Sequence, residues 1–267
     1  MSSRTPVCPQ PAPGENPRKG ARVDVAGTPF DLLAIEEVDR LITERPAGEV
    51  FRYVATPNVD HVVRSARKGY RHLYEGAWIS VCDSRVLARL APLVGVRFPE
   101  VVTGSDLTRR VFERHLDSGD QVTVIGSDDA TILELRRRFP HLAIRHHNPP
   151  MGFIRNEANI ADAVRFVLAN PSRFVFLAVG SPQQELLAQR LADAGATGVG
   201  LCIGASILFV VGAEKRAPLW VQRLNLEWLF RFAQNPRRLW RRYFVDDPLV
   251  LALIAKQKFE MATKNRE

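Results

Sequence analysis

Short apolar runs alternate with longer amphipathic segments along most of this chain. Runs rich in β-branched and aromatic residues predict buried strands at Val50–Ala55, Ala77–Cys82, Gln121–Ile125, Ala143–Arg145, Phe174–Val179 and Gly198–Ile203. Helical patterns lie between them at Pro57–Lys68, Ser105–Leu116, Asp129–Phe139, Ile160–Ala169 and Glu185–Ala194. This alternation predicts an α/β fold in which a mostly parallel sheet is flanked by helices on both faces. Ligands of such sheets collect in the loops where strands end and helices begin.

The segment from Glu214 to Phe244 combines tryptophan and arginine at helical spacing. Its apolar residues recur as one helical face at Trp220, Leu224, Trp228, Leu229 and Phe232. The cationic side chains beside that face are Arg216, Arg223, Arg231, Arg237, Arg238, Arg241 and Arg242. Such a surface suits an anionic membrane interface, a pyrophosphate-bearing substrate, or both. A solvated face of a core helix is the alternative interpretation.

The net charge of +8 favours an acidic partner, whether nucleic acid, anionic lipid or a phosphorylated substrate. The three cysteines form no CxxC pair, which argues against a disulfide framework or a zinc site and is compatible with a reducing cytosol. We find no signal-peptide pattern and no apolar run approaching the ~20 residues that span a bilayer. The sequence therefore predicts a protein that touches a membrane but does not cross it.

Composition also suggests three parts. Residues 1–22 are rich in Pro, Ser, Gly and charge and predict a disordered tail. Residues 23–211 carry the strand–helix alternation and predict a Rossmann-like catalytic body. Residues 212–267 predict a basic, amphipathic helical appendage, because the charge balance changes near Gly212.

Two of the strand-end loops offer residues for catalysis. In the first, Thr56 is expected to cap the next helix and Pro57 to take its first position, which leaves Asn58 without a structural explanation. In the second, Asp83 follows a strand, where it is either a helix cap or a general base. Arg85 lies two residues further on.

Two further loops suit the binding of an anion. Thr103 and Gly104 precede a helix that Ser105 is expected to start, so this loop is either a cap or a phosphate cradle. Gly180 opens a loop in which Gln183 and Gln184 stand at a helix N-terminus, where backbone N–H groups favour anions. Two adjacent glutamines at that place indicate ligand contacts.

Taken together, these motifs resemble the WecG/TagA/CpsF glycosyltransferases, also called glycosyltransferase family 26. The resemblance runs from about Val23 to about Pro248. In chain order its signatures are the TxN loop at Thr56 and Asn58, the Asp83 loop, VTGSDL at Val102–Leu107, GSPQQE at Gly180–Glu185, and the RAPxW…LEWLxR…NPRRxxRRY series from Arg216 to Tyr243. The last two signatures, in this order and spacing, make the resemblance specific.

The resemblance implies an inverting, metal-independent transfer from a UDP-sugar to a polyprenyl-pyrophosphate-linked saccharide, in the synthesis of cell-surface polymers or exopolysaccharides. It assigns the catalytic carboxylate to Asp83, supporting roles to Thr56 and Asn58, and a substrate contact to Gln184. It implies no cofactor and no metal; the chain carries no DxD motif. The Trp/Arg segment in residues 212–267 further predicts a cytoplasmic enzyme held peripherally on the inner face of the cell membrane. A homo-oligomer stays open.

The chain differs from the family at three positions. Ser84 follows the catalytic Asp where glycine is common, Val101 replaces an arginine before VTG, and Leu208 replaces an aspartate in a glycine-rich segment. Arg85 or Arg97 is the candidate substitute for the missing arginine. The donor sugar stays open among N-acetylmannosamine, its uronic acid and glucose.

Three rival interpretations remain. A nucleotide-binding oxidoreductase would need a GxGxxG fingerprint, which the chain lacks. A nucleic-acid-binding module could use the Arg/Trp segment, although its aromatic residues follow a helical period rather than forming a stacking platform. A catalytically inactive relative is the third, because the surroundings of Asp83 and Val101 are altered.

Overall fold

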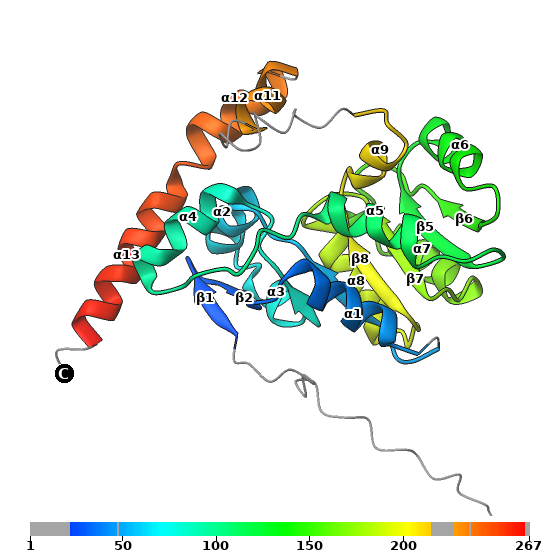
Figure 1. The fold of residues 1–267 in the computed structure, drawn as a ribbon, viewed down its shortest axis with the longest axis horizontal. Helices are drawn as coiled ribbons and strands as arrows, with labels where there is room; N and C mark the ends of the chain where they lie inside the picture. The colour runs from blue at the N-terminus through cyan, green and yellow to red at the C-terminus, as the bar shows by residue number, and fades with distance from the viewer. Residues whose placement is uncertain (1–21, 47, 215–226, 235, 265–267) are drawn as a thin grey trace, which may run out of the picture.

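A six-stranded, all-parallel sheet forms the centre of the protein (Figure 1). The computed structural model describes residues 22–46, 48–214, 227–234 and 236–264. Across the sheet the strand order is β4-β3-β8-β7-β5-β6. These strands are β3 (Arg52–Ala55), β4 (Ile79–Ser80), β5 (Gln121–Gly126), β6 (Ala143–His147), β7 (Phe174–Ala178) and β8 (Val199–Cys202).

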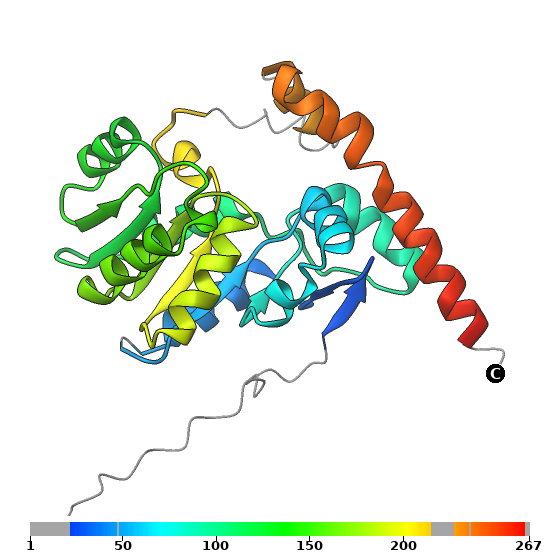
Figure 2. The ribbon, with the colours of Figure 1, turned by 180° about the vertical axis from the view of Figure 1, so that it is seen from behind.

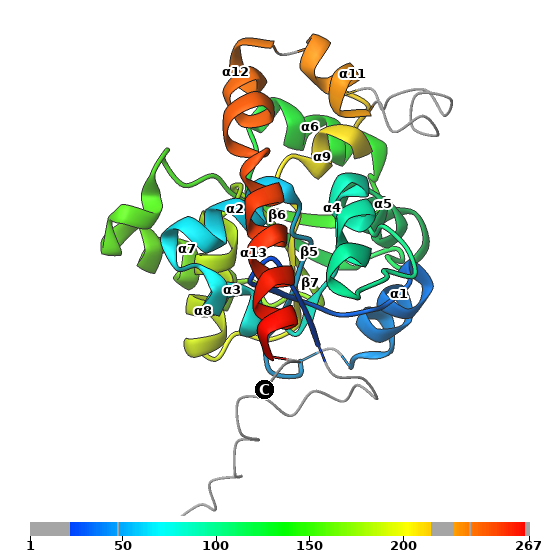
Figure 3. The same cartoon turned by 90° about the vertical axis from the view of Figure 1, so that its left-hand side faces the viewer.

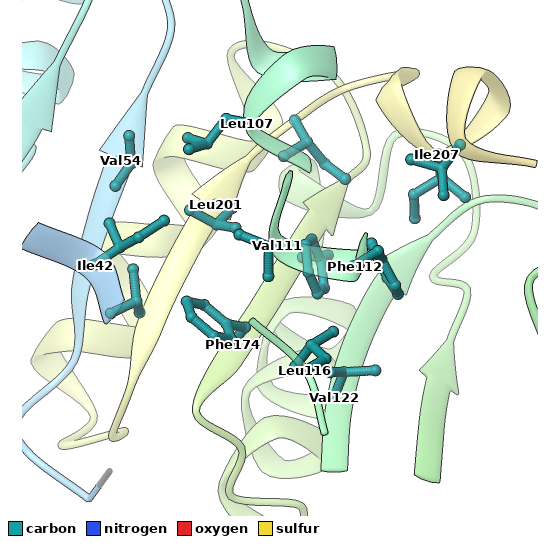
Figure 4. Packing of buried hydrophobic residues seen from close by; sticks show 14 of the residues in the cluster. Ile42, Val54, Leu107, Val111, Phe112, Leu116, Val122, Phe174, Leu201 and Ile207 are labelled. Atoms are coloured by element: carbon teal, nitrogen blue, oxygen red, sulfur yellow. The ribbon is translucent and has the colours of Figure 1, made fainter. Parts of the chain in front are cut away.

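Helices cover both faces of this sheet because successive residues of each strand point to opposite sides. In β7, Phe174 and Phe176 pack on one face, whereas Val175 and Leu177 pack on the other. The first face is covered by α1 (Ile35–Glu44), α5 (Gly104–Arg114), α6 (Asp129–Arg138) and α9 (Ser206–Val210), whose packing Figure 4 shows. The second is covered by α3 (Arg71–Glu75), η2 (Phe153–Arg155), α7 (Glu157–Ala169) and α8 (Gln183–Asp193).

The predicted fold class is confirmed. All six predicted strands and all five predicted helices occur, with ends that differ by up to three residues. The elements without a sequence prediction include α1, α3 and an antiparallel hairpin of β1 (Val23–Val25) and β2 (Thr28–Phe30). They are short or lie outside the strand–helix alternation, so periodicity alone gave little signal for them.

A third apolar cluster lies beside the sheet, beyond β4. It joins the β1–β2 hairpin, α2 (Val59–Lys68), α4 (Arg85–Leu90), η1 (Ala91–Val94) and the last helix, α13 (Leu249–Lys264). Val250 and Ile254 of α13 are each 2% exposed within this cluster. Gln257 accepts a hydrogen bond from the Ala26 amide at 2.7 Å and donates one to the Asp24 carbonyl at 2.8 Å. Figure 3 shows α13 running beside α2.

The rest of the C-terminal segment lies beyond the amino end of α13 (Figures 1 and 2). From residue 227 on, its described residues form α11 (Glu227–Gln234), α12 (Pro236–Arg241) and the π-helical turn η3 (Arg242–Asp246). Asp246 pairs with Arg67 of α2 at 3.1 Å, so η3 also contacts the body. The three-part division of the chain remains a prediction, but its last helix is integrated into the core.

The predicted N-terminal tail and the predicted lack of a membrane-spanning segment both involve residues outside the described ranges. The expected tail, residues 1–22, lies outside the described residues except for Arg22. Within the described part of the chain, no helix combines the length and the apolar character needed to cross a membrane.

Candidate active site

The loops after β3 and β4, together with the N-terminus of α5, meet at the carboxyl edge of the sheet. The Asp83 amide donates to the Pro57 carbonyl at 3.0 Å, and the Val102 amide donates to the Cys82 carbonyl at 2.9 Å. These bonds continue the ladder beyond the strands and bring the three segments side by side. The sequence prediction that the site lies at strand ends therefore corresponds to one contiguous place in the fold.

Gly104, the first residue of α5, is the point on which three side chains converge. Its amide donates a hydrogen bond to Asp83 Oδ2 at 3.1 Å. A Cβ atom on residue 104 would lie 3.0 Å from Thr56 Oγ1, 3.3 Å from Ser206 Oγ and 3.8 Å from Asp83 Oδ2. Glycine therefore suits this position, because a larger residue would crowd the polar side chains that approach the backbone here.

Thr56 and Asp83 are not helix caps, which corrects the structural interpretation of both loops. Asn58 caps α2, because its Oδ1 accepts the His61 amide at 3.3 Å. Ser84 caps α4, because its Oγ accepts the Leu87 amide at 3.2 Å. Thr56 is instead 8% exposed beside Gly104, and Asp83 is half-buried.

The helix that follows Val102 also begins earlier than expected. Thr103, rather than Ser105, caps α5, and its Oγ1 accepts the Asp106 amide at 3.1 Å. The same hydroxyl donates to Asp106 Oδ2 at 2.7 Å. The Thr103 side chain is thus part of the cap itself, and Gly104 presents the first backbone N–H of the helix to Asp83.

Gln184 links the loop after β7 to the loop after β8. Its side chain is buried, and its Oε1 accepts the Gly204 amide at 2.8 Å. Its Nε2 donates to Glu185 Oε1 at 2.9 Å. Gln183 and Gly180, the other predicted contacts in this loop, are half-buried, and Gly180 adopts a φ of +76° that favours glycine. The carboxamide of Gln184 therefore has internal partners at both ends.

Glu185 is a fully buried carboxyl beneath this loop, with 1% of its surface exposed. Burial raises its pKa, while the hydrogen bond from Gln184, the nearby Ser181 hydroxyl and the charge of Arg64 act in the opposite direction. Arg64 itself bonds the Ser181 carbonyl and pairs with Asp60. The net direction is towards the neutral acid, because burial penalises the charged form.

The other predicted contacts lie further out. Arg85 is exposed at the start of α4, and Val101 and Leu208 are half-buried. Arg237 is exposed in the first turn of α12. The backbone places Arg231 on α11, Arg238 and Arg241 on α12, and Arg242 in η3. Arg216 and Arg223 lie outside the described residues.

Three groups at the site received no role from sequence reasoning: Ser206, the Gly204 amide and Glu185. The signal for the first two was the glycine-rich segment after the last strand, which strand-end geometry brings to the α5 terminus. Glu185 lay within the GSPQQE motif, but an isolated acidic residue gives no sequence signal that it will be buried.

Two other features were checked as alternative sites. A surface cavity of about 500 Å³ lies at the opposite, amino edge of the sheet and is lined by residues such as Thr43, Asp120 and Arg173. It is remote from the four strand-end loops, and none of the predicted site residues lines it. Within the described ranges, no three His, Cys, Asp or Glu side chains are grouped as metal ligands would be.

Comparison with known proteins agrees with the motifs. The model of the glycosyl transferase WecG/TagA/CpsF family matches residues 23–264. An N-acetylglucosaminyldiphosphoundecaprenol N-acetyl-beta-D-mannosaminyltransferase of Staphylococcus aureus strain MW2 is 23% identical over 246 residues, covering 89% of this chain and 94% of the relative. The protein of the same name from strain MRSA252 is 24% identical with the same coverage.

Proposed function

This chain belongs to the WecG/TagA/CpsF family and is a glycosyltransferase, and on that premise we propose that it transfers a sugar from a UDP-sugar to a saccharide carried on a polyprenyl diphosphate. The observation that carries the proposal is the position of Asp83. Its carboxylate lies at the carboxyl edge of the sheet, held by the Gly104 amide at 3.1 Å, and Thr56 and Ser206 approach the same glycine. That is where α/β proteins bind their ligands.

Asp83 is the general base of an inverting reaction. It removes the proton from the acceptor hydroxyl as the hydroxyl oxygen attacks the anomeric carbon, and the bond from that carbon to the UDP oxygen breaks. UDP departs with the bonding electrons, and the configuration at the anomeric carbon inverts because the hydroxyl attacks from the face opposite UDP. The Gly104 hydrogen bond supports this role, because it fixes the orientation of the carboxylate before the substrate arrives.

Backbone amides and arginines carry the charge of the departing diphosphate. The first turn of the eleven-residue helix α5 begins beside Asp83, and helix N-termini stabilise anions. The arginines of the C-terminal segment are the second source of positive charge. These groups make the reaction independent of a divalent metal, in keeping with a sequence that carries no DxD motif.

The donor is a UDP-activated N-acetylmannosamine, its uronic acid, or glucose. The names of the two staphylococcal relatives favour N-acetylmannosamine, and they favour an N-acetylglucosaminyl group on the lipid diphosphate as acceptor. Both sugars belong to the cell-wall or exopolysaccharide polymers that bacteria build on lipid carriers. Identity of 23–24% leaves the choice of donor to experiment.

The C-terminal segment holds the enzyme on the cytoplasmic face of the membrane. Trp240, Phe244 and Val245 expose 54%, 58% and 47% of their surfaces, and Arg237 is exposed nearby in sequence. Apolar side chains beside cations suit the interface of an anionic bilayer. Each basic residue near such a surface contributes about 1 kcal/mol, so binding should be reversible and weaken in salt.

A donor panel tests the chemistry. UDP release is measured with each UDP-sugar and a polyprenyl-diphosphate-linked N-acetylglucosamine analogue, for the wild type, Asp83→Asn and Asp128→Asn. Asp128 is a matched control, because it also follows a strand but caps α6 through Thr131 at 2.7 Å, and Asn caps equally well.

Loss of the base should lower kcat of Asp83→Asn by ~10²–10⁴-fold, while Asp128→Asn stays near the wild type. Asn at position 83 can still accept the Gly104 hydrogen bond, so the fold should be preserved. A folded Asp83→Asn enzyme with near-normal turnover would refute the assignment. If the wild type releases UDP from none of the UDP-sugars tested, the result would instead favour a catalytically inactive relative.

Vesicle sedimentation tests the membrane contact. Full-length protein should pellet with vesicles of anionic phospholipid and not with neutral ones, and Arg237→Glu should pellet less at a given salt concentration. Arg137→Glu is the control, since Arg137 is an exposed residue of α6 and its replacement changes the net charge equally. Equal loss for both variants would mean that net charge alone drives binding. RNA filter binding with the same variants addresses the nucleic-acid alternative.

A further inference from the structure

Three hydrogen bonds and one close approach of Ser206 to Gly104 connect Glu185 with the neighbourhood of Asp83. Glu185 Oε1 accepts Gln184 Nε2 at 2.9 Å, and Gln184 Oε1 accepts the Gly204 amide at 2.8 Å. Gly204 opens the turn that carries Ser206 to within 3.3 Å of the Cβ position of Gly104. The Gly104 amide then donates to Asp83. Four segments that are far apart in sequence are joined in this way.

The orientation of the Gln184 carboxamide decides whether this chain of contacts is intact. If the carboxamide were flipped, its NH₂ group would face the Gly204 amide, which is also a donor, and its oxygen would face Glu185 Oε1. The Gly204 amide and Glu185 Oε1 therefore select this orientation together, one as donor and the other as acceptor. The Ser206 hydroxyl anchors the same turn by donating to the Ile203 carbonyl at 2.6 Å.

The carboxyl of Glu185 is suited to this role as a neutral acid. It is 1% exposed, and its Oε2 and the buried Ser181 Oγ have no hydrogen bond of normal geometry to a described residue. A proton on Oε2 would supply a donor that Ser181 Oγ can accept. The nearby Arg64 guanidinium pairs with Asp60, and its charge acts to lower the pKa of Glu185.

We propose that Glu185 is a positioning residue: its carboxyl holds the Gln184 carboxamide in one orientation and, through it, the Gly204–Ser206 turn beside the α5 terminus whose Gly104 amide binds Asp83. This role deepens the proposed function and rests on it for its effect on turnover. Glu185 itself does not touch the substrate. Its effect on catalysis passes through Gln184 and the turn.

The groups that face Glu185 do not titrate in its place near neutral pH. Burial raises the pKa of the Tyr53 and Tyr74 phenols and of the Cys202 thiol, so all three stay protonated there. The charged groups are Arg64 and its partner Asp60 on α2. If the unfolding constant changes near neutral pH in the wild type and not in a Glu185 variant, the titrating group is therefore the Glu185 carboxyl.

Two substitutions test whether kcat depends on the hydrogen bonds of residue 185 or only on the volume of its side chain. Glu185→Gln keeps the shape, offers an oxygen to Gln184 Nε2 and donates an N–H where the acid would carry its proton. Glu185→Leu fills the apolar surroundings but removes the acceptor. We expect Glu185→Gln to keep kcat within about threefold of the wild type and Glu185→Leu to lose at least about tenfold, as misplaced catalytic groups do. The double variant Gln184→Ala/Glu185→Leu should have a kcat no lower than that of Glu185→Leu alone. Both substitutions break the same chain of contacts, so their effects should not add.

The pH dependence of the unfolding constant tests directly whether the Glu185 carboxyl binds a proton in the folded protein. A folded-state pKa above the unfolded value means that the native protein binds the extra proton. The unfolding constant of the wild type should therefore rise, relative to Glu185→Gln, by up to about tenfold per pH unit above the unfolded pKa of about 4.3. This difference should level off above the folded pKa.

Amide hydrogen exchange measures the hydrogen bond between the Gly204 amide and Gln184 without depending on catalysis. The Gly204 amide should exchange faster in Glu185→Leu and at the wild-type rate in Glu185→Gln. If no donor supports turnover but this pattern holds, the proposed function fails and the positioning contact stands. If Glu185→Leu turns over normally with an unchanged Gly204 amide, or if Glu185→Gln is as impaired as Glu185→Leu, the proposal is overturned.

Discussion

Replacement of Gly104 by alanine tests the convergence on which the candidate site depends. The new Cβ would lie 3.0 Å from Thr56 Oγ1 and 3.3 Å from Ser206 Oγ, so these side chains must move by a few tenths of an ångström. Thr56 is 8% exposed, and Ser206 is anchored to the Ile203 carbonyl at 2.6 Å, so neither can swing away into solvent. The strain will therefore fall on the hydrogen bond between the Gly104 amide and Asp83.

Two opposing terms set the stability of Gly104→Ala. Alanine in a helix is favoured over glycine by up to about 1 kcal/mol, whereas overpacking costs about 1–3 kcal/mol. The net loss should be about 0–2 kcal/mol, a fall in Tm of no more than about 8 °C for a chain of this size. Turnover should fall further, by about 10–100-fold, because a displacement of about 1 Å in a catalytic group can cost 10²-fold.

UDP release per folded enzyme and thermal unfolding are measured together, with Gly76→Ala as the matched control. A Cβ on Gly76 would meet Gln189 Nε2 at 3.0 Å and Tyr53 Oη at 3.1 Å, so the crowding is similar. Gly76 precedes β4 and lies at the amino edge of the sheet, so this variant should lose stability without losing turnover. A folded Gly104→Ala enzyme that keeps kcat within twofold would refute the convergence as a requirement for catalysis.

Three further outcomes are expected. Dialysis against EDTA should leave UDP release largely unchanged, and a loss that Mg²⁺ or Mn²⁺ restores would contradict the metal-independent mechanism. Ile254→Ala should lower the free energy of unfolding by about 2–4 kcal/mol, because the side chain is 2% exposed in the core under α13; a change below 0.5 kcal/mol in chemical denaturation would mean that α13 docks only loosely. Gly200→Ala should be strongly destabilising, since its Cβ would lie 2.3 Å from the Phe51 ring, and normal expression with an unchanged Tm would contradict the packing of β8.

The alternation of strand and helix was readable from the sequence because it depends on local periodicity. A run such as Phe174–Ala178 is apolar at every position, as a strand buried on both faces must be. The family motifs were equally local, and they marked the loops that the fold brings together. Which strands are neighbours was not local information: β3 pairs with β8, about 150 residues later in the chain, through contacts that no window of sequence contains.

The assignment of helix caps needed the tertiary structure. Thr56 and Asn58 are both good capping residues, and so are Asp83 and Ser84, so propensity could not choose between them. The choice follows from where the chain leaves each strand. Because the Asp83 amide is bound to the Pro57 carbonyl, the ladder extends beyond β3 and the helix begins only after Asn58.

The sequence by itself determined the fold class and the family, because both are written in residue type and spacing, and the same motifs predicted the loops of the candidate site. Only the tertiary structure decided that Ser206 stands beside Gly104, that α13 belongs to the core, and that Glu185 is buried. The physical reason is that hydrophobic periodicity and capping act over a few residues. The environment of a side chain, and with it the charge state of a carboxyl, is set by segments that meet only in the folded chain.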